Sequence, residues 1–213
     1  MRRFRDRIDA GRALALALEE YRGRRDVVVL GLPRGGVPVA AEVADALGAP
    51  LDVFVVRKLG VPGHEEFAMG AIASGGVQVL DRSTIEMLAI PQAAIDRVAE
   101  RERQELERRE RQYRGGRPPP QVAGRIAILV DDGLATGASM RAAVAALRDL
   151  GPAHIVVAVP VGAAQTCRML QEEADEVVCA IVPEDFQAVG LWYDDFGQTS
   201  DAEVQAALRE AAR

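Results

Sequence analysis

The sequence has few of the residues that would tie it to a disulfide framework, a metal site or a membrane. Among 213 residues there are two cysteines, Cys167 and Cys179, and two histidines. The cysteine spacing suggests no metal site, and buried thiols in a reducing compartment are the simplest interpretation. No run approaches the roughly 18 apolar residues of a membrane helix, and no signal-peptide core follows the N-terminal arginines. We therefore expect a soluble, cytoplasmic protein.

Aromatic residues are also scarce, at 4%, although hydrophobic residues make up 49% of the chain. A core of reasonable size is therefore expected, built from valine, alanine, leucine and isoleucine. The net charge is −6 and the pI is near 5.1. This acidic balance argues against non-specific nucleic-acid binding, although a local basic patch stays open.

Strand-like and helix-like segments alternate along the chain. Short apolar runs, typical of buried strands, occupy 27–32, 51–56, 126–130, 155–161 and 177–182. Helical patterns separate them, and a helix is expected near each terminus, the first capped by Asp9 and the last by a Ser200–Glu203 capping box. This order predicts a single α/β domain over 1–213, with a doubly wound, mainly parallel sheet covered on both faces.

The middle of the chain interrupts this alternation. Glycine and proline are frequent in 59–80, which favours a loop or flap with a short hairpin over 71–80. A helical turn is expected at 83–88 and a long charged helix at 91–113, before a Gly- and Pro-rich break. We therefore interpret 59–120 as an insertion into the domain.

The predicted helix at 91–113 alternates glutamate and arginine and has only a narrow apolar stripe. Opposite charges spaced i,i+4 would support it by roughly 0.3–0.5 kcal/mol per pair. The simplest interpretation is a solvated helix packed along one edge. A lid or a contact within a homodimer is the alternative, whereas nucleic-acid binding is not favoured because acids nearly balance bases.

The segment 126–139 is the most informative part of the chain. An apolar strand ends in Asp131 and Asp132, a loop containing glycine and threonine follows, and a helical pattern then begins. Such a loop places backbone N–H groups and hydroxyls at a helix N-terminus, where an anion is favoured. Carboxylates beside a phosphate cradle suit a ligand with sugar hydroxyls and a phosphate. The alternative is an ordinary strand-to-helix turn with an acidic cap.

This segment resembles the phosphoribosyl-pyrophosphate (PRPP) signature of the type I phosphoribosyltransferases at every position. The resemblance implies that Asp131 and Asp132 hold the ribose 2′- and 3′-hydroxyls, and that they contact Mg²⁺ only through the ligand or water. It also implies a 5′-phosphate loop, which comprises Ala135, Thr136, Gly137, Ala138 and Ser139.

The run Pro-Arg-Gly-Gly-Val-Pro at 33–38 resembles the pyrophosphate loop of the same family. Arg34 supplies a forked cation, and Gly35 and Gly36 supply adjacent amides that can form a concave anion nest. The resemblance also implies an unusual cis peptide in this loop, with strain near Arg34–Gly35. A plain strand-to-helix connection is the alternative.

Three of these clusters, 33–36, 57–58 and 131–139, each follow a predicted strand directly. Ligands of open α/β sheets bind beyond the carboxyl ends of the strands, so a shared site is expected there. Family members often place a basic residue where Arg57 and Lys58 lie, to meet the pyrophosphate. The alternative is a solvated basic pair.

Two further groups are candidates by position. His64 lies in a segment where many family members have a mobile loop, although an exposed histidine is the simpler interpretation. Phe186 and Trp192 follow the last predicted strand, within a C-terminal segment at 183–213 that we expect to form a hood. They could stack on an acceptor base, or they could fix the tail to the core.

The resemblance implies an Mg²⁺-dependent enzyme that moves a phosphoribosyl group from PRPP to a small nitrogenous acceptor. Ala135 stands where members acting on 6-oxopurines commonly have Asp, which argues against hypoxanthine and guanine and leaves the acceptor open. A non-catalytic regulator that binds PRPP or a nucleotide, and a competence-type relative without a settled reaction, are the alternatives. Neither a membrane nor a nucleic acid is expected as a partner, and a homodimer stays open.

Overall fold

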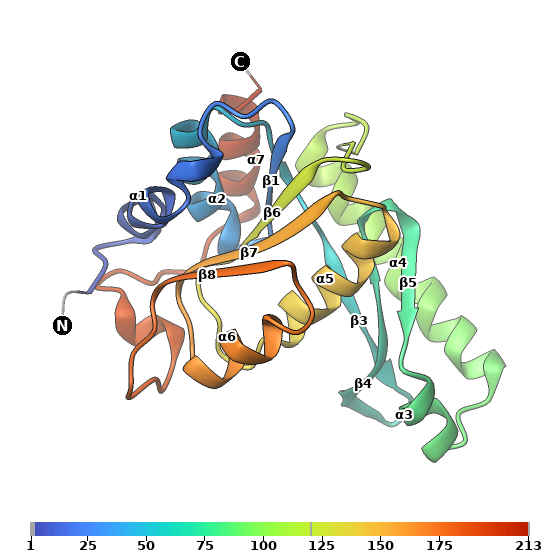
Figure 1. The fold of residues 1–213 in the computed structure, drawn as a ribbon. Coiled ribbons are helices and arrows are strands. Elements are labelled where there is room, and N and C mark those ends of the chain that lie inside the picture. The colour runs from blue at the N-terminus through green and yellow to red at the C-terminus, as the bar shows by residue number, and fades with distance from the viewer. Residues whose placement is uncertain (1–2, 120, 213) are drawn as a thin grey trace.

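The computed structural model describes residues 3–119 and 121–212, which form two β-sheets and the helices around them (Figure 1). The larger sheet has five strands in the order β2-β1-β6-β7-β8, and every neighbouring pair is parallel. Its strands are β1 (Val27–Gly31), β2 (Leu51–Val53), β6 (Ile126–Val130), β7 (His154–Val161) and β8 (Glu176–Ile181). The predicted parallel α/β fold is confirmed.

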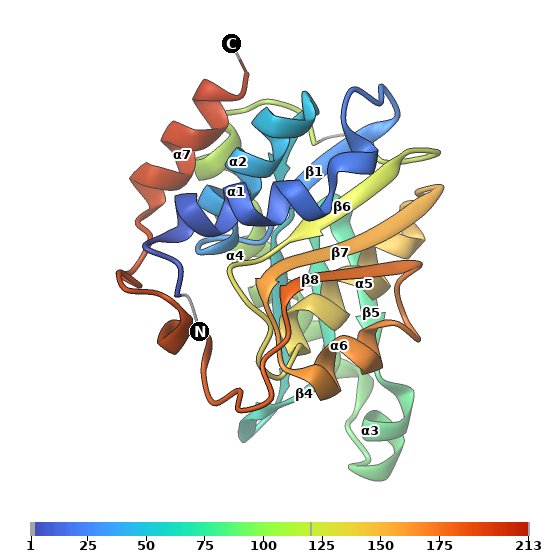
Figure 2. The same cartoon turned by 60° about the vertical axis from the view of Figure 1, so that its left-hand side comes forward.

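Helices cover both faces of this sheet (Figure 2). One face carries α1 (Arg7–Ala17), α2 (Gly36–Leu47) and α7 (Asp201–Glu210), and the other carries α5 (Ala138–Asp149) and α6 (Ala164–Leu170). Strand residues alternate between the two cores: Val29 and Ile128 pack on the first set of helices, and Leu30 and Leu129 pack on the second. This division explains why the strands read as continuous apolar runs.

The register of the two central strands positions the site. Val27 pairs with Ile126 and the pairing continues in step to Gly31 with Val130, so β1 and β6 end level with each other. The segments that follow, 32–36 and 131–139, therefore leave the sheet side by side.

The smaller sheet is antiparallel and contains β3 (Val56–Val61), β4 (His64–Ala73) and β5 (Val77–Leu80). The prediction of one strand over 51–56 is thus wrong, because the chain leaves the larger sheet after Val53. The prediction of a loop or flap over 59–80 is also wrong, apart from the hairpin expected over 71–80.

Glycine explains why the rest of this sheet, outside the 71–80 hairpin, was not predicted. Gly63 lies in the β3–β4 turn with φ 81°, and Gly60 lies at an irregularity where a Cβ would come within 2.8 Å of the Glu65 carbonyl oxygen. Gly70 has φ 158°, and a Cβ there would come within 2.3 Å of the Val79 carbonyl oxygen. These glycines permit a turn and close strand crossings, which in sequence look like breaks.

The charged helix α4 (Gln92–Arg114) lies along the smaller sheet and reaches α7 at its C-terminal end (Figure 1). Its apolar stripe, which includes Ile95 and Leu106, packs on one face of that sheet, while α5 packs on the other. The shorter helices are α3 (Arg82–Met87) and three 3₁₀ turns, Glu19–Tyr21, Ser74–Gly76 and Val189–Trp192.

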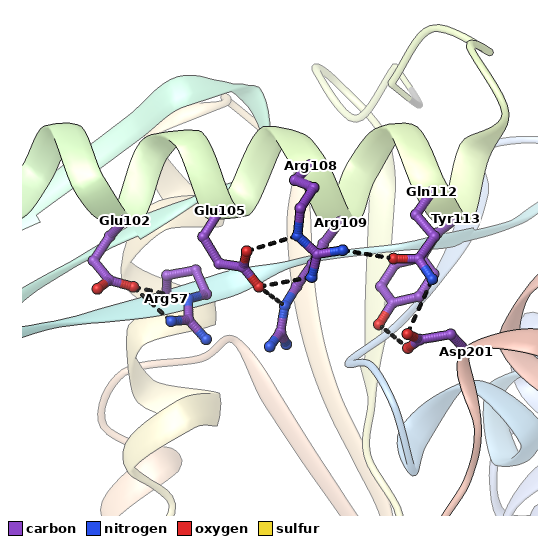
Figure 3. Close-up of polar contacts among 8 residues, drawn as sticks. All are labelled: Arg57, Glu102, Glu105, Arg108, Arg109, Gln112, Tyr113 and Asp201. Atoms are coloured by element: carbon purple, nitrogen blue, oxygen red, sulfur yellow. Dashed lines mark hydrogen bonds and ion pairs between the residues drawn. The ribbon is translucent and has the colours of Figure 1, made fainter.

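Polar side chains continue the packing of α4 along its inner face (Figure 3). Arg57 of β3 donates to the buried Glu102 at 2.6 Å, and at the far end the Tyr113 hydroxyl donates to Asp201 of α7 at 2.8 Å. Burial and the bond to Asp201 raise the pKa of Tyr113 to about 12. The helix is therefore solvated on one side and fixed on the other by buried polar contacts.

The N-cap of the last helix is as predicted, whereas the N-cap of the first helix is not. Ser200 and Glu203 form a reciprocal capping box at α7. Asp6, and not Asp9, caps α1 by accepting from the backbone N–H of Asp9 at 2.8 Å. Among the described residues no helix is long and apolar enough to span a bilayer.

Candidate active site

Asp131 and Asp132 follow β6 directly, at the carboxyl edge of the larger sheet. Both side chains are partly exposed, and the backbone N–H of Asp132 donates to Asp131 Oδ1 at 2.9 Å. Arg7 of α1 contacts Asp132 Oδ2 through Nε at 2.9 Å and through Nη2 at 2.8 Å. The two acids are thus neighbours in space, and one of them has a cationic partner.

This setting shifts the acidity of the pair. Burial and the neighbouring charge of Asp132 raise the pKa of Asp131 to about 8. Burial also raises the pKa of Asp132, whereas its ion pair with Arg7 opposes that rise. The pair therefore carries less negative charge at neutral pH than two free carboxylates would.

The glycine loop after β1 lies directly against these acids. Its start is tied to the end of β6, since the backbone N–H of Leu32 donates to the Val130 carbonyl at 2.9 Å. A Cβ on Gly35 would lie 2.0 Å from Asp132 Oδ2, and one on Gly36 would lie 2.8 Å from the Asp131 Cα. Only glycine therefore allows the loop to approach the acids this closely.

The peptide bond between Pro33 and Arg34 is cis. A cis peptide is thus present in this loop, as the resemblance implies, but the unusual geometry was expected near Arg34–Gly35, one bond further on. Gly35 itself has ordinary helical angles, with φ −61° and ψ −32°.

The loop at 135–139 leads into the N-terminus of α5. Gly137 caps this helix with φ 75°, and Ala135, Thr136, Ala138 and Ser139 are exposed. Thr166 of α6 contacts this loop in two ways. The Thr166 hydroxyl donates to the Ala135 carbonyl at 2.6 Å. The Thr166 methyl group packs so close to Gly137 that a Cβ there would lie 2.6 Å from it. Accessible amides and hydroxyls at a helix start are a suitable anion site.

The prediction that Arg57 and Lys58 lie at the end of a strand of the larger sheet is wrong, because both residues lie inside β3 of the smaller sheet. Arg57 is paired with Glu102, and the Lys58 ammonium donates to the Glu66 carbonyl at 2.9 Å. Arg57 therefore has its partner on α4, and Lys58 has its partner in the smaller sheet.

The aromatic residues after β8 form a brace between the N-terminal segment and the segment that precedes α7. Phe186 and Trp192 pack against a small core that includes Phe4 and Tyr193. The Phe4 backbone N–H donates to the Trp192 carbonyl at 2.8 Å, and the Tyr193 hydroxyl donates to the Asp132 carbonyl at 2.5 Å. The interpretation that these aromatics fix the tail to the core agrees with these contacts.

A cavity of about 410 Å³ opens beside the acids. Arg7, Arg34, Gly35 and Asp132 line one part of it, and the tail segment 196–199 lines the rest. Its volume lies in the range of small-ligand sites. Two guanidinium groups close to a carboxylate suit a ligand with both anionic and hydroxyl groups.

Three of these residues were not predicted from the sequence. Arg7 is 125 positions from its partner Asp132, and the first turn of a helix with several arginines gives no signal for such a contact. Thr166 and Tyr193 act through single hydroxyl groups on backbone carbonyls, which leave no spacing pattern in the sequence.

The two acids at the end of β6 do not by themselves enclose a metal ion. The described residues contain no group of three or more His, Cys, Asp or Glu side chains able to enclose a metal ion. Mg²⁺ usually keeps several waters and takes one or two protein carboxylates together with substrate phosphates. The expectation that Asp131 and Asp132 contact Mg²⁺ only through the ligand or water stays a prediction.

Comparison with known proteins agrees with this geometry. The family model of the phosphoribosyl transferase domain matches residues 4–195. Two Mycobacterium tuberculosis proteins, each provisionally named a phosphoribosyl transferase, are 50% identical over 213 residues, which is 100% of this chain and 48% of theirs. The chain thus spans about half the length of these relatives.

Among solved structures, TT1426 from Thermus thermophilus is 49% identical, with a TM-score of 0.88 and 99% of each chain covered. AQ2163 from Aquifex aeolicus is 11% identical, with a TM-score of 0.50, and the match covers 86% of this chain and 78% of that one. At that identity the likeness extends to the fold alone.

Proposed function

The chain belongs to the phosphoribosyl transferase domain family, and on that premise we propose that it transfers the 5-phosphoribosyl group of PRPP to a small nitrogenous acceptor. The observation that carries the proposal is the contact of the two acids with the glycine loop, next to an accessible helix start. A ligand held there would present its ribose, its 5′-phosphate and its pyrophosphate to separate groups.

Each part of PRPP has proposed partners. Asp131 and Asp132 accept from the ribose hydroxyls, and the pyrophosphate lies on the glycine loop beside the Arg34 guanidinium. The 5′-phosphate is bound by Ala135, Thr136, Gly137, Ala138 and Ser139. Arg57 and Lys58 assist with the pyrophosphate only if they exchange their present partners, and Phe186 and Trp192 border the acceptor.

In the proposed reaction a bond from C1 of the ribose to the acceptor nitrogen forms, and the bond from C1 to the pyrophosphate oxygen breaks. Pyrophosphate leaves with the electron pair of that bond, and the proton lost from the acceptor nitrogen passes to solvent. The transition state resembles an oxocarbenium ion, so no covalent nucleophile from the protein is required. The protein fixes the ribose, neutralises the leaving group and excludes water. Bound Mg²⁺ supplies positive charge to the pyrophosphate.

The acceptor is constrained by the position before Thr136. Ala135 has no group that could exchange a proton with a base, whereas an aspartate there would. We therefore propose an acceptor whose nitrogen needs no carboxylate at this position, which argues against the 6-oxopurines.

The test is pyrophosphate release from PRPP and Mg²⁺ in the presence of a panel of nitrogenous acceptors. We expect release with at least one acceptor and its loss in Asp131→Asn and Asp132→Asn. An exposed carboxylate far from the site provides the matched control, Asp149→Asn, which should keep full activity. Tight PRPP binding without turnover on any acceptor would favour a regulator, and no PRPP binding would refute the proposal.

A further inference from the structure

Arg7 is held in place from three sides. Its Nε and Nη2 contact the same oxygen of Asp132, Oδ2, and its Nη1 donates to the Gly197 carbonyl at 2.7 Å. The ring of Phe196 lies under the guanidinium at 4.2 Å, and the side chain is 13% exposed. A guanidinium fixed by a carboxylate, a carbonyl and a ring face has little freedom to turn.

Two carboxylate oxygens remain, one on each acid. Asp132 Oδ2 is taken by Arg7, and Asp131 Oδ1 is taken by the Asp132 backbone N–H. Asp132 Oδ1 and Asp131 Oδ2 accept no hydrogen bond from any of the described residues. Neither oxygen is fully buried, since the described residues contain no buried side-chain oxygen that lacks a partner. Each acid therefore keeps one oxygen for a ligand, the number that two adjacent sugar hydroxyls would require.

We propose that Arg7 is a positioning residue for ribose recognition: by occupying Oδ2 of Asp132 it directs Oδ1 of that carboxylate at one ribose hydroxyl. This inference rests on the proposed function, because it assumes a ribose at the twin acids. It makes the first turn of α1 and the tail at 196–197 parts of the sugar site.

A different role for Arg7 would follow from its charge alone. Arg7 lines the cavity together with Arg34, so its guanidinium could simply attract the phosphates of the ligand. The two roles differ in what they recognise. If Arg7 positions Asp132, its removal affects the recognition of a ribose hydroxyl. If Arg7 acts through its charge, its removal weakens the binding of every phosphorylated ligand equally, whatever hydroxyls the ligand carries.

The experiment uses calorimetric binding of ribose 5-phosphate and of its 2-deoxy and 3-deoxy analogues, with PRPP and Mg²⁺ as a reference. The wild type should prefer the complete ribose over at least one deoxy analogue by roughly tenfold, because that analogue leaves a carboxylate acceptor unpaired. Arg7→Ala should lose most of this preference. Arg7→Lys, which keeps a cation within reach of Asp132, should restore part of it.

Arg12→Ala is the matched control, because Arg12 lies on the same helix in an exposed ion pair with Glu42 at 2.8 Å. It should bind every ligand as the wild type does. Equal weakening of all ligands by Arg7→Ala, with the hydroxyl preference kept, would overturn the inference and assign Arg7 a charge role.

Two other results have distinct meanings. A wild type that binds PRPP but shows no hydroxyl preference would also overturn the inference, while the proposed function would stand. A wild type that binds neither PRPP nor ribose 5-phosphate would refute the proposed function itself. If Arg7→Ala failed to fold by its thermal transition, Arg7→Lys would decide, since it must retain more of the preference than an equally folded Arg7→Gln.

Discussion

Asp131 and Asp132 lie side by side at the end of β6, and among the described residues only Asp132 of this pair forms an ion pair. Arg7 compensates Asp132, and Asp131 has burial and a like charge against it, so its pKa rises to about 8. A proton on Asp131 weakens the repulsion between the two acids.

This shift makes the stability of the free protein depend on pH. Between about pH 4 and pH 8 the folded chain keeps a proton on Asp131 that the unfolded chain has released, so stability falls as pH rises through this window. Asp131→Asn should therefore have a flatter profile. We expect it to lose at least about 1 kcal/mol less than the wild type between pH 5 and pH 9 in urea unfolding. Asp149→Asn should follow the wild type, and parallel profiles for Asp131→Asn would contradict the prediction.

Residue patterns identified the acids and both loops because each belongs to a local motif. Asp131 and Asp132 end an apolar run, and Gly35 and Gly36 are adjacent after another. Arg7 could not be found in this way, because its role depends on a contact 125 residues away. The site was therefore predictable where it is continuous in sequence and not where the tertiary fold completes it.

At the scale of elements, the same distinction explains the fold. Three strands of the larger sheet, β1, β6 and β7, were recognisable because burial on both faces leaves uninterrupted apolar runs. In the smaller sheet β4 begins with five exposed residues and contains Gly70, so neither alternation nor a run is visible. The long helix α4 was predicted nearly to its ends, although its buried polar partners were not.

The ion pair between Arg57 and Glu102 provides a prediction at this scale. Glu102 is buried and Arg57 is partly so, and Glu102→Ala would leave the cation without its partner. We expect a loss of about 2 kcal/mol in the free energy of unfolding, below the full cost of a deeply buried pair because Arg57 retains some solvent. Glu107→Ala removes an exposed pair with Arg111 at 3.7 Å and should cost less than about 0.5 kcal/mol.

The double variant Arg57→Met with Glu102→Leu separates structure from binding. Replacement of a buried pair by apolar residues is often close to neutral, so this protein should fold. If it unfolds like the wild type and still binds PRPP equally well, Arg57 has no part in the pyrophosphate site. Weaker PRPP binding by the folded double variant would support that role.

Across the whole molecule, the segment at Phe4–Arg7 and the segment between β8 and α7 meet at the candidate site although neither carries the signature. The backbone N–H groups of Asp194 and Asp195 donate to the carbonyls of Phe4 and Arg5, both at 2.8 Å. This brace is tied to the acids on both sides, by Arg7 from the N-terminal segment and by Tyr193 from the tail. A ligand on the acids should therefore be coupled to the order of both segments.

Hydrogen exchange tests this coupling on the protein as a whole. Segments near chain ends usually exchange by local opening, which a ligand elsewhere does not affect. Opening of this brace would release Arg7 and Tyr193 from Asp132, so PRPP at 100 times its Kd should oppose opening by up to about 2.7 kcal/mol. The amides of Phe4, Asp194 and Asp195 should then exchange more slowly by up to roughly a hundredfold. The Arg24–Asp26 turn, which precedes β1 and carries an exposed ion pair, should not change. If the brace helps to build the site, it cannot open without loss of the ligand. Equal exchange of the brace amides with and without PRPP would therefore mean that the two segments only cover the site.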